Sequence, residues 1–356
     1  MGAVLLGGSA GPLAPVADSK TAVTSEPGAT GDRSLSILLA VREALTEEMG
    51  RDERVMILGL DVATMGGVFR VTSGLLQKFG AQRVIDTPLA EGAIVGSSLG
   101  LAIGGMIPVA EIQFLGFTQQ AFHQIGAQLG RYRFRSRGRY HAQVTLRAPF
   151  GGGVRAPEFH ADSLEALFAQ APGLKVVCPA FPDDAKGMLL SAIRDPDPVL
   201  FLEPQRLYRS ISGQVPKGDV TVPLGVSRLV REGTDLTLIA WSAAVHTCLD
   251  AADSLAEEGV SAAVLDLRSI TPLDVDGLVE SVLKTGKAVV VHEAPLTSGF
   301  GAEVVATLQH EAFWDLDAPV ARVTGLDIPY PPGSLEDHYL PSVGRVIEAA
   351  RATVNF

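Results

Sequence analysis

The spacing of hydrophobic positions changes repeatedly along this chain, and each change marks a predicted element. Segments with a period near 3.6, such as 36–49, predict amphipathic helices that bury one face. Short apolar runs, such as 54–62, predict strands that are buried on both sides. The two patterns alternate from Ser34 onward. Such alternation predicts the α/β class, with mostly parallel sheets that carry helices on both faces.

The alternation occurs in two blocks, which predict two three-layer domains in tandem at 34–203 and 224–356. In the first block we expect strands at 54–62, 83–88, 106–114, 142–149, 174–180 and 198–204, and helices at 36–49, 71–80, 117–134, 163–170 and 183–195. In the second block we expect strands at 235–241, 262–268, 287–293 and 318–325, and helices near 245–258, 274–285, 301–313 and 341–352. Residues 204–223 hold three prolines and two glycines without a clear period, which predicts a linker.

Residues 1–33 are rich in Gly, Ala, Pro, Ser and Thr, which predicts a disordered extension. This segment lacks the long apolar core of a secretory signal and the arginines of a mitochondrial presequence, so we expect a cytoplasmic protein. Two cysteines, Cys178 and Cys248, cannot build a disulfide framework. Hydrophobic residues make up 47% of the chain, which favours extensive subunit interfaces over a lone monomer.

Nineteen uncharged residues, 92–110, lie between Glu91 and Glu111. Glycines recur in this run at every fourth position, which places them along one stripe of a helix, and they are Gly92, Gly96, Gly100 and Gly104. Glycine weakens a helix by about 1 kcal/mol relative to alanine, so the stripe predicts close packing of another backbone. A membrane span and a buried core helix capped by Glu91 are the alternatives. In a dry site Glu91 would instead be a candidate proton donor or acceptor.

The charge of the chain is unevenly distributed. Residues 1–223 hold 21 basic and 21 acidic side chains, whereas 224–356 hold 8 and 19, which accounts for the whole net charge of −11. An acidic domain disfavours nucleic acid and favours a basic protein partner, or it serves solubility alone. Arginines at every second position of 131–139 could suggest RNA binding, but an interface or a loop rich in ion pairs is the better interpretation for a chain that is otherwise neutral to acidic. We expect no nucleic acid and no membrane as partners.

Two further segments place polar residues after predicted strands, where sheets of this class carry their sites. The glycine-rich loop 149–163 contains His160 and Asp162, which could form a base with its orienting carboxylate, a pair of metal ligands, or a structural loop. His292 and Glu293 lie at the end of another predicted strand and predict either a site or a contact between domains.

Together, several segments resemble the beta subunit of the decarboxylating first component of 2-oxo acid dehydrogenase complexes. The resemblance spans nearly all of 34–356 and rests on segments in family order and spacing, which are DTPLAE, PVAEIQF, RYRFRSRGRY, PFGGGVRAPEFH, PGLKVV, DAKGMLLSAIRDPDPVLFLEP, LYRS and HEAPLTSGFGAE. It implies a first domain that binds the pyrimidine half of thiamine diphosphate and a second domain of the transketolase C-terminal type.

The resemblance also implies roles for single residues. Glu91 would hydrogen-bond the cofactor's aminopyrimidine ring and favour the imino tautomer that activates the thiazolium carbon. Phe117 would lie against the pyrimidine ring, and Gln113 at the pocket wall. His160 would transfer a proton during reductive acylation of the lipoyl disulfide. The sequence departs from the family pattern at Leu101, where glutamine is usual, and after the histidine, where many relatives continue Ser-Gln.

The motif that binds magnesium and the diphosphate in such enzymes, GDG followed by an asparagine, does not occur in this sequence. The resemblance therefore implies an alpha chain that holds Mg²⁺, an α2β2 heterotetramer, and no activity of this subunit alone. It further implies a K⁺ ion bound by main-chain carbonyls near Ala192, Asp195 and Asp197. The acidic C-terminal domain would dock the basic subunit-binding domain of the dihydrolipoyl acyltransferase, whose lipoyl domain receives the acyl group.

The sequence leaves the substrate open, because its segments are shared among pyruvate, branched-chain and acetoin-type relatives. A transketolase-like thiamine enzyme and a non-catalytic assembly subunit are the rival interpretations. The first would carry GDG in the same chain, and the second is disfavoured by the presence of Glu91 and His160.

Overall fold

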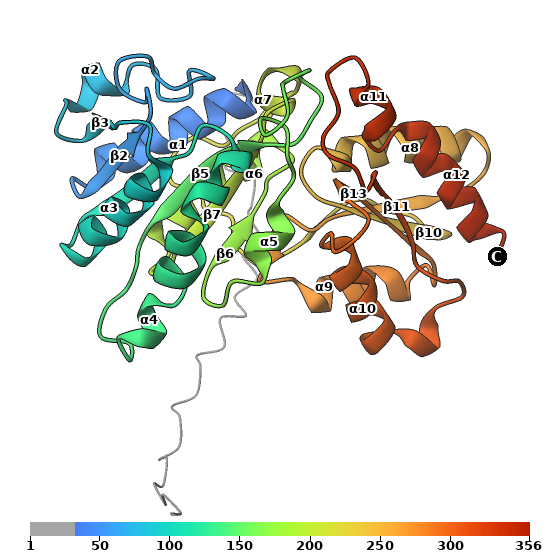
Figure 1. Cartoon of the computed structure of the whole chain (residues 1–356). Helices are drawn as coiled ribbons and strands as arrows, with labels where there is room; N and C mark the ends of the chain where they lie inside the picture. The colour runs from blue at the N-terminus through green and yellow to red at the C-terminus, as the bar shows by residue number, and fades with distance from the viewer. Residues whose placement is uncertain (1–32) are drawn as a thin grey trace, which may run out of the picture. The chain divides into compact units, whose positions relative to one another are not determined.

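Two helix-covered sheets make up the computed structural model, which describes residues 33–356 (Figure 1). They confirm the predicted fold class of two tandem α/β domains with mostly parallel strands. The extension predicted over 1–33 lies, apart from its last residue, outside the described residues.

The first sheet has the strand order β12-β6-β7-β5-β4-β2-β3. Its strands are β2 (Val55–Gly59), β3 (Val84–Asp86), β4 (Ile107–Glu111), β5 (Thr145–Phe150), β6 (Lys175–Val177), β7 (Val199–Pro204) and β12 (Ser269–Thr271). All neighbouring pairs are parallel except β12 and β6. Because β12 comes from the C-terminal half of the chain, the second domain supplies an edge strand to the first domain's sheet.

Helices cover both faces of this sheet. They are α1 (Ile37–Arg51), α2 (Leu75–Phe79), α3 (Glu91–Ile103), α4 (Tyr132–Arg135), α5 (Glu165–Ala169) and α6 (Pro182–Arg194). On one face α1 and α6 pack together around a core that includes Ile57 and Phe201. On the other face α3 packs on a second core that includes Val95 and Leu146 and continues into the second domain. The helix α1 begins at residue 37 because the Ser36 side chain accepts from the backbone N–H of Leu39.

The uncharged run 92–110 is divided between two elements, which excludes the membrane-span interpretation for it. The run contains all of α3 except its first residue, Glu91, then a turn, and then all of β4 except its last residue, Glu111. Pro108 lies within β4. No helix in the described part of the chain is long and apolar enough to cross a membrane.

The helix predicted over 117–134 is wrong as a single element. The chain forms a 3₁₀ helix η1 (Leu115–Ala121), a π-helix η2 (His123–Leu129) and the short α4 instead. At two glycines near the ends of this region, Gly116 and Gly130, other segments pack directly on the backbone. A Cβ at Gly116 would overlap the Phe159 carbonyl, and one at Gly130 would lie 3.0 Å from the Pro172 carbonyl oxygen. These contacts fix the local backbone where the sequence pattern alone continues a helix.

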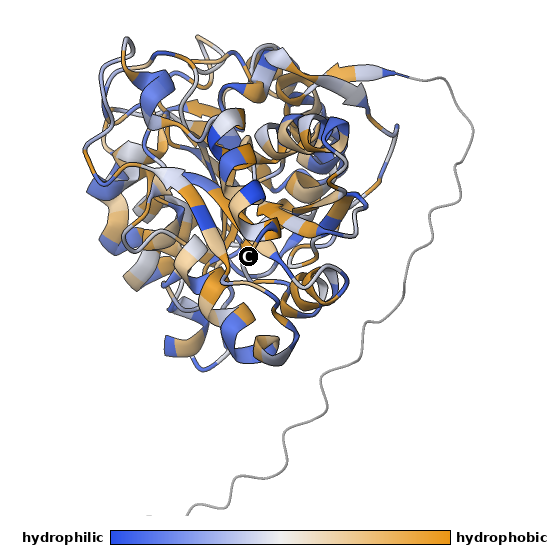
Figure 2. Cartoon of the chain, turned by 90° about the vertical axis from the view of Figure 1, so that its right-hand side faces the viewer, coloured by the Kyte–Doolittle hydropathy of each residue, from blue (hydrophilic) through white to orange (hydrophobic). Residues whose placement is uncertain are grey.

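The second sheet has the strand order β14-β13-β10-β11-β9. Its strands are β9 (Arg228–Arg231), β10 (Leu236–Ala240), β11 (Ala262–Asp266), β13 (Ala288–Pro295) and β14 (Ala321–Gly325), of which β9 alone is antiparallel to its neighbour. Its helical segments are α8 (Ala244–Glu257), α9 (Val275–Leu283), α10 (Gly301–Glu311), η3 (Phe313–Asp315), α11 (Glu336–Tyr339) and α12 (Val343–Val354). Figure 2 shows both hydrophobic and hydrophilic colours on the helices of this side, as expected for surface helices that bury one face.

Residues 204–223, predicted as a linker, contain two short elements. These are α7 (Leu207–Ser210) and β8 (Ser212–Gln214). The strand β8 pairs with β1 (Ser34–Ser36) in a separate two-stranded sheet. This pairing joins the segment after the first domain to the start of that domain.

Candidate active site

Three loops at one edge of the first sheet carry the predicted site residues. Glu91 follows β3, Gln113 and Phe117 follow β4, and His160 lies in the loop after β5. Because β3, β2, β4 and β5 are neighbouring parallel strands, their carboxyl ends lie at the same edge. The topology therefore brings all four residues to one edge, where sheets of this class bind ligands.

Glu91 is the first residue of α3, and its side chain is almost completely buried, with 7% exposed. Its Oε2 atom has no hydrogen-bond partner among the described residues. The preceding residue, Ala90, provides no side-chain cap for the helix. A buried carboxyl oxygen without a partner costs free energy, so this atom is available to a donor from outside the chain.

His160 lies among aromatic side chains of the segment after β4. Its ring centroid is 4.5 Å from that of Phe114 and 5.1 Å from that of Phe117. Phe117 is half-buried, and Gln113 lies nearby in sequence with its Nε2 3.4 Å from an oxygen of Asp61. The structure thus brings Phe117 and His160 into contact and places Gln113 on the same segment.

The loop around His160 fixes which ring nitrogen can exchange a proton. The Nδ1 atom lies 3.1 Å from the Glu158 carbonyl oxygen. Since a carbonyl oxygen can only accept, Nδ1 carries the hydrogen in this contact and Nε2 remains to accept a proton. Asp162 does not orient the ring, and the described residues contain no group of His, Cys, Asp and Glu side chains suited to a metal ion. Burial, followed by the charge of Glu158, raises the pKa of Asp162.

A buried ion cluster lies between the central strands, and the sequence analysis did not identify it. Arg147 donates to both carboxyl oxygens of Glu203 at 2.7 and 2.9 Å, and to Glu111 at 2.6 Å. Tyr208 donates to Glu203 at 2.5 Å. Desolvation raises the pKa of Glu111, against the opposing effect of Arg147. Charged residues within apolar strand sequences, as in PVAEIQF and FLEP, were the available signal.

His292 and Glu293 form contacts within and between the domains. His292 is fully buried and stacks on Trp241 at a centroid distance of 5.1 Å. Burial, followed by the charge of Arg322, lowers the pKa of His292 to about 4, so the ring is neutral near pH 7. Glu293 accepts from the backbone N–H of Gly152 at 2.8 Å. Of the two expectations for this pair, the structure supports the contact between domains.

A small cavity lies beside that contact. Its volume is about 10 Å³, close to the space of one water molecule. Residues of both domains line it, including Ser163, Glu165, Trp241 and Glu293. Glu165 accepts from the Trp241 indole N–H at 3.2 Å, and burial raises the pKa of Glu165 to about 7. This carboxyl group can therefore change its protonation state near neutral pH.

The residues predicted to bind a monovalent cation lie at the end of α6. The backbone N–H of Asp195 donates to the Ala192 carbonyl at 3.3 Å, and the Asp195 carboxylate pairs with Lys175. Asp197 pairs with Arg133 at 2.6 Å, which is the one ion pair that the arginines of 131–139 form within the described part of the chain. Both carboxylates are therefore engaged in ion pairs.

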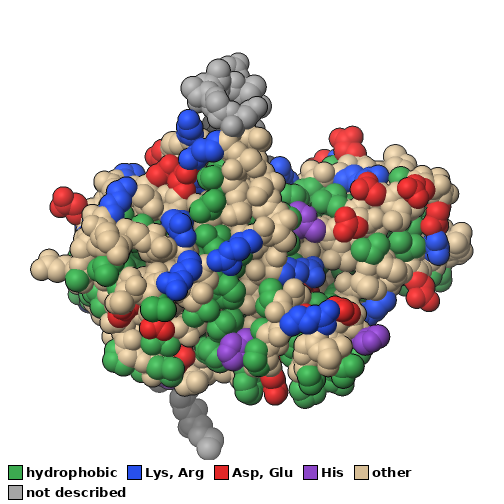
Figure 3. Space-filling view, turned by 90° about the horizontal axis from the view of Figure 1, so that it is seen from above, with side chains coloured by type: hydrophobic (Ala, Val, Ile, Leu, Met, Phe, Trp, Pro, Cys, Tyr) green, Lys and Arg blue, Asp and Glu red, His purple; other side chains and the backbone are tan. Residues whose placement is uncertain are grey.

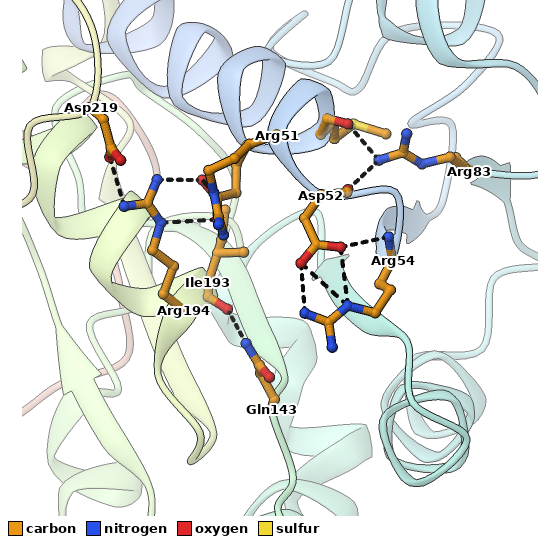
Figure 4. Close-up of polar contacts among 10 residues, drawn as sticks. Arg51, Asp52, Arg54, Arg83, Gln143, Ile193, Arg194 and Asp219 are labelled. Carbon is orange, nitrogen blue, oxygen red and sulfur yellow. Dashed lines mark hydrogen bonds and ion pairs between the residues drawn. The ribbon is translucent and has the colours of Figure 1, made fainter.

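Polar side chains fix the end of α6 against its surroundings (Figure 4). Gln143 donates to the Ile193 carbonyl at 2.9 Å. Arg194 pairs with Asp219 and, on α1, with Glu48, each at 2.6 Å. These contacts join the end of α6 to α1 and to the segments that carry Gln143 and Asp219.

The glycine stripe of α3 is mostly open within the described chain. A Cβ at Gly96 or Gly100 would meet no atom within 4 Å, and one at Gly92 would lie 3.6 Å from the Gln120 carbonyl oxygen. Gly96 and Gly100 are exposed. The backbone expected to pack on this stripe does not come from the described residues of this chain.

Comparison with known proteins identifies the family of each domain. Residues 33–210 match the family described as transketolase, pyrimidine binding domain, and residues 225–346 match transketolase, C-terminal domain. The chain is 49% identical over 322 residues to the pyruvate dehydrogenase E1 component subunit beta of Bacillus subtilis (strain 168), covering 90% of this chain and 99% of that protein. The proteins of the same description from Staphylococcus epidermidis and Staphylococcus aureus (strain N315) are 49% and 48% identical over the same shares.

Two solved structures share the fold. One, described as a split gene transketolase, inactive beta4 tetramer, has a TM-score of 0.74 and 25% identity, and the match covers 90% of this chain and 98% of that one. The other, a transketolase mutant from Pichia stipitis, has a TM-score of 0.64 and 15% identity, and covers 91% of this chain and 46% of that one. The second shows similarity of fold only.

Proposed function

We propose, since this chain belongs to the family of pyruvate dehydrogenase E1 component beta subunits, that it forms one half of a thiamine diphosphate-dependent enzyme for oxidative decarboxylation of a 2-oxo acid. The observation that carries the proposal is the buried, unpartnered Oε2 of Glu91 at the carboxyl edge of the pyrimidine-binding domain. The relatives' names favour pyruvate as substrate, and branched-chain 2-oxo acids remain the alternative to test.

The residues at this edge fit the pyrimidine half of the cofactor. Glu91 offers a dry carboxyl oxygen for a ring nitrogen, and half-buried Phe117 offers an aromatic face for the ring. Gln113 would line the same wall. When bound, thiamine diphosphate supplies a nucleophilic carbon for the 2-oxo group and takes up the electron pair released with CO₂. The part of Glu91 is to hold a proton at Oε2 and exchange it with the aminopyrimidine.

His160 is proposed to act in the second half-reaction. Its Nε2 is left to exchange protons because Nδ1 is bound to the Glu158 carbonyl. Reduction of a lipoyl disulfide during acyl transfer requires a proton at the sulfur that is not acylated. The Nε2 atom of His160, whose ring lies beside Phe117, is the position from which that proton would be delivered.

An alpha chain is the proposed partner at the glycine stripe. Gly96 and Gly100 are exposed, and a partner's backbone could approach them directly. The alpha chain would also hold the diphosphate and Mg²⁺, because this sequence lacks the GDG motif. The α2β2 assembly and the K⁺ ion at Ala192, Asp195 and Asp197 belong to the same proposal.

The acidic C-terminal domain is proposed to dock the subunit-binding domain of the acyltransferase component. Figure 3 shows acidic side chains over the surface on the right of the view, while Lys and Arg gather nearer its middle. This distribution agrees with the 8 basic and 19 acidic residues of 224–356. Such a field attracts a basic partner over distances of about 10 Å at 0.1 M salt.

Co-expression with a matching alpha chain tests the proposed function. We expect the purified pair to decarboxylate pyruvate when supplied with thiamine diphosphate and Mg²⁺, and this chain alone to be inactive. Branched-chain 2-oxo acids and acetoin are assayed in parallel to assign the substrate. A pair that binds the acyltransferase component but turns over none of these compounds would contradict the enzyme proposal and favour a non-catalytic assembly subunit.

A further inference from the structure

The loop that carries His160 is closed by one side-chain amide. Gln205, which follows the last strand residue of β7, donates from Nε2 to the Gly151 carbonyl and, at 2.7 Å, to the His160 carbonyl. These two carbonyls belong to the first and last residues of the segment 151–160. Gln205 is 3% exposed, so this amide closes the loop from inside the protein.

The chemistry of the contact fixes the orientation of the amide. Both neighbours of Nε2 are carbonyl oxygens, which only accept, so the NH₂ group and not the oxygen must face them. Its two hydrogens match the two acceptors. A carboxylate or an apolar side chain of the same length would leave the buried Gly151 carbonyl and the half-buried His160 carbonyl without this donor.

The rest of the loop is held from two sides. On one side the Phe159 backbone lies directly on Gly116 of η1, where a side chain would not fit. On the other side the second domain binds the loop, because Glu293 accepts from Gly152 N–H at 2.8 Å and Glu336 accepts from Arg155 N–H at 3.1 Å. The contacts from the second domain are made to Gly152 and Arg155, whereas the hydrogen bond from Gln205 is made to the backbone of His160 itself.

We infer that Gln205 is a positioning residue for His160: its amide sets the ring of His160 against Phe114 and Phe117 for proton transfer to the lipoyl group. The inference rests on the proposed function for the role of His160. A displacement of about 1 Å at a proton-transferring group is enough to cost on the order of 100-fold in rate. Loss of the amide should therefore impair lipoyl acylation more than decarboxylation.

The test compares two half-reactions of the complex with the alpha chain. We measure acylation of a free lipoyl domain and decarboxylation coupled to an artificial electron acceptor, and we take their ratio. In Gln205→Glu and Gln205→Met this ratio should fall at least tenfold at pH 8. The exposed Gln214→Glu, with the same charge change nine residues further on, should keep the wild-type ratio. A ratio within twofold of wild type in both Gln205 variants would overturn the inference.

A pH profile distinguishes the loss of the Gln205 hydrogen-bond donor from a general loss of packing around it. The introduced carboxyl of Gln205→Glu faces two carbonyl oxygens in a buried site, so its pKa should be raised and its protonated form can donate one hydrogen bond. The ratio for Gln205→Glu, relative to wild type, should recover several-fold from pH 8 to pH 6. Gln205→Met cannot donate and should show no recovery. Equal profiles for the two variants would contradict the inference.

A double-mutant cycle shows whether Gln205 acts through His160. In a His160→Ala background, Gln205→Glu should change the ratio by less than twofold, whereas multiplying effects would refute the inference. If His160→Ala alone acylates normally, the proposed role of His160 fails, and this inference fails with it. If His160→Ala is impaired while Gln205→Glu is not, only the inference fails.

A chemical readout without turnover completes the test. The rate at which diethylpyrocarbonate modifies His160, followed by peptide mass spectrometry, reports how firmly the half-buried ring is held. It should rise at least threefold in Gln205→Glu and stay unchanged in Gln214→Glu. An unchanged rate in Gln205→Glu would count against a positioning role.

Discussion

Glu165 is buried where the two domains meet, and its pKa makes the stability of that contact depend on pH. In the folded chain burial raises this pKa from 4.5 to about 7. Between pH 4.5 and 7 the folded state therefore keeps a proton that the unfolded state has lost. The contribution of Glu165 to the free energy of unfolding is therefore largest below pH 4.5, and it decreases as the pH rises to 7.

Replacing Glu165 with glutamine, which mimics the protonated acid, should remove this dependence. We expect the midpoint of thermal unfolding to increase more, on replacing Glu165 with glutamine, at pH 8 than at pH 5. The gain corresponds to on the order of 1–3 kcal/mol, because one unit of pKa shift is about 1.4 kcal/mol. Thermal unfolding of the chain at the two pH values measures it. The same difference in midpoint at both values would contradict a titrating Glu165.

His160→Ala, reconstituted with the alpha chain, should separate the two half-reactions. Decarboxylation coupled to an artificial electron acceptor needs no proton from the histidine, so it should persist. Acylation of the lipoyl domain should fall about 100-fold or more, the usual effect of removing a general acid or base. Rapid-mixing assays of both steps provide the measurement. If both half-reactions persist, His160 has another role.

The helix α3 offers a prediction in which stability and assembly change in opposite directions. Alanine at Gly96 and Gly100 meets no atom within 4 Å, and it favours a helix by up to about 1 kcal/mol per site. The chain alone should therefore become more stable, with a higher thermal midpoint, while its affinity for the alpha chain falls. Gly50→Ala in α1, which is also exposed and free of neighbours, is the matched control that should stabilise without weakening assembly. Undiminished affinity of Gly96→Ala and Gly100→Ala would contradict an interface at the stripe.

The sequence predicted the elements in which the spacing of hydrophobic residues by itself indicates a helix or a strand. Buried strands such as β2 and β7 are continuous apolar runs, and α1 and α6 have a clear apolar face. The strands β1, β8, β9 and β12 were not predicted. Each has three or four residues and gains its hydrogen bonds from a distant partner, so a local pattern carries little of the information.

The candidate site likewise contains residues that could be predicted from local sequence and others that could not. Glu91, Gln113, Phe117 and His160 could be chosen from sequence because each lies at the end of a predicted strand or in the segment after it, and the family resemblance assigns each a role. The groups that hold them could not, because their contacts join distant segments. Gln205 reaches His160 across 45 positions of the chain, and it lies where a linker was predicted.

Across the whole chain, the separation of charge predicts how the second domain binds its partner. Asp315 and Asp317 are exposed beside Trp314, whose side chain is 91% exposed. Reversing both aspartates to lysine should weaken binding of the subunit-binding domain and reduce its dependence on salt. Titration calorimetry at several salt concentrations measures this, with Glu53→Lys on the first domain as control. Unchanged binding at every salt concentration would defeat the docking proposal.

The central claim is that this chain supplies the carboxyl group that activates thiamine diphosphate held between two unlike subunits. Turnover of pyruvate by the reconstituted pair, with wild-type chain and with Glu91→Gln, tests it most directly. Glutamine keeps the shape of the side chain but cannot exchange the proton, so turnover should fall about 100-fold or more, while the pair still assembles. An assembled Glu91→Gln enzyme with near-normal turnover would contradict the claim.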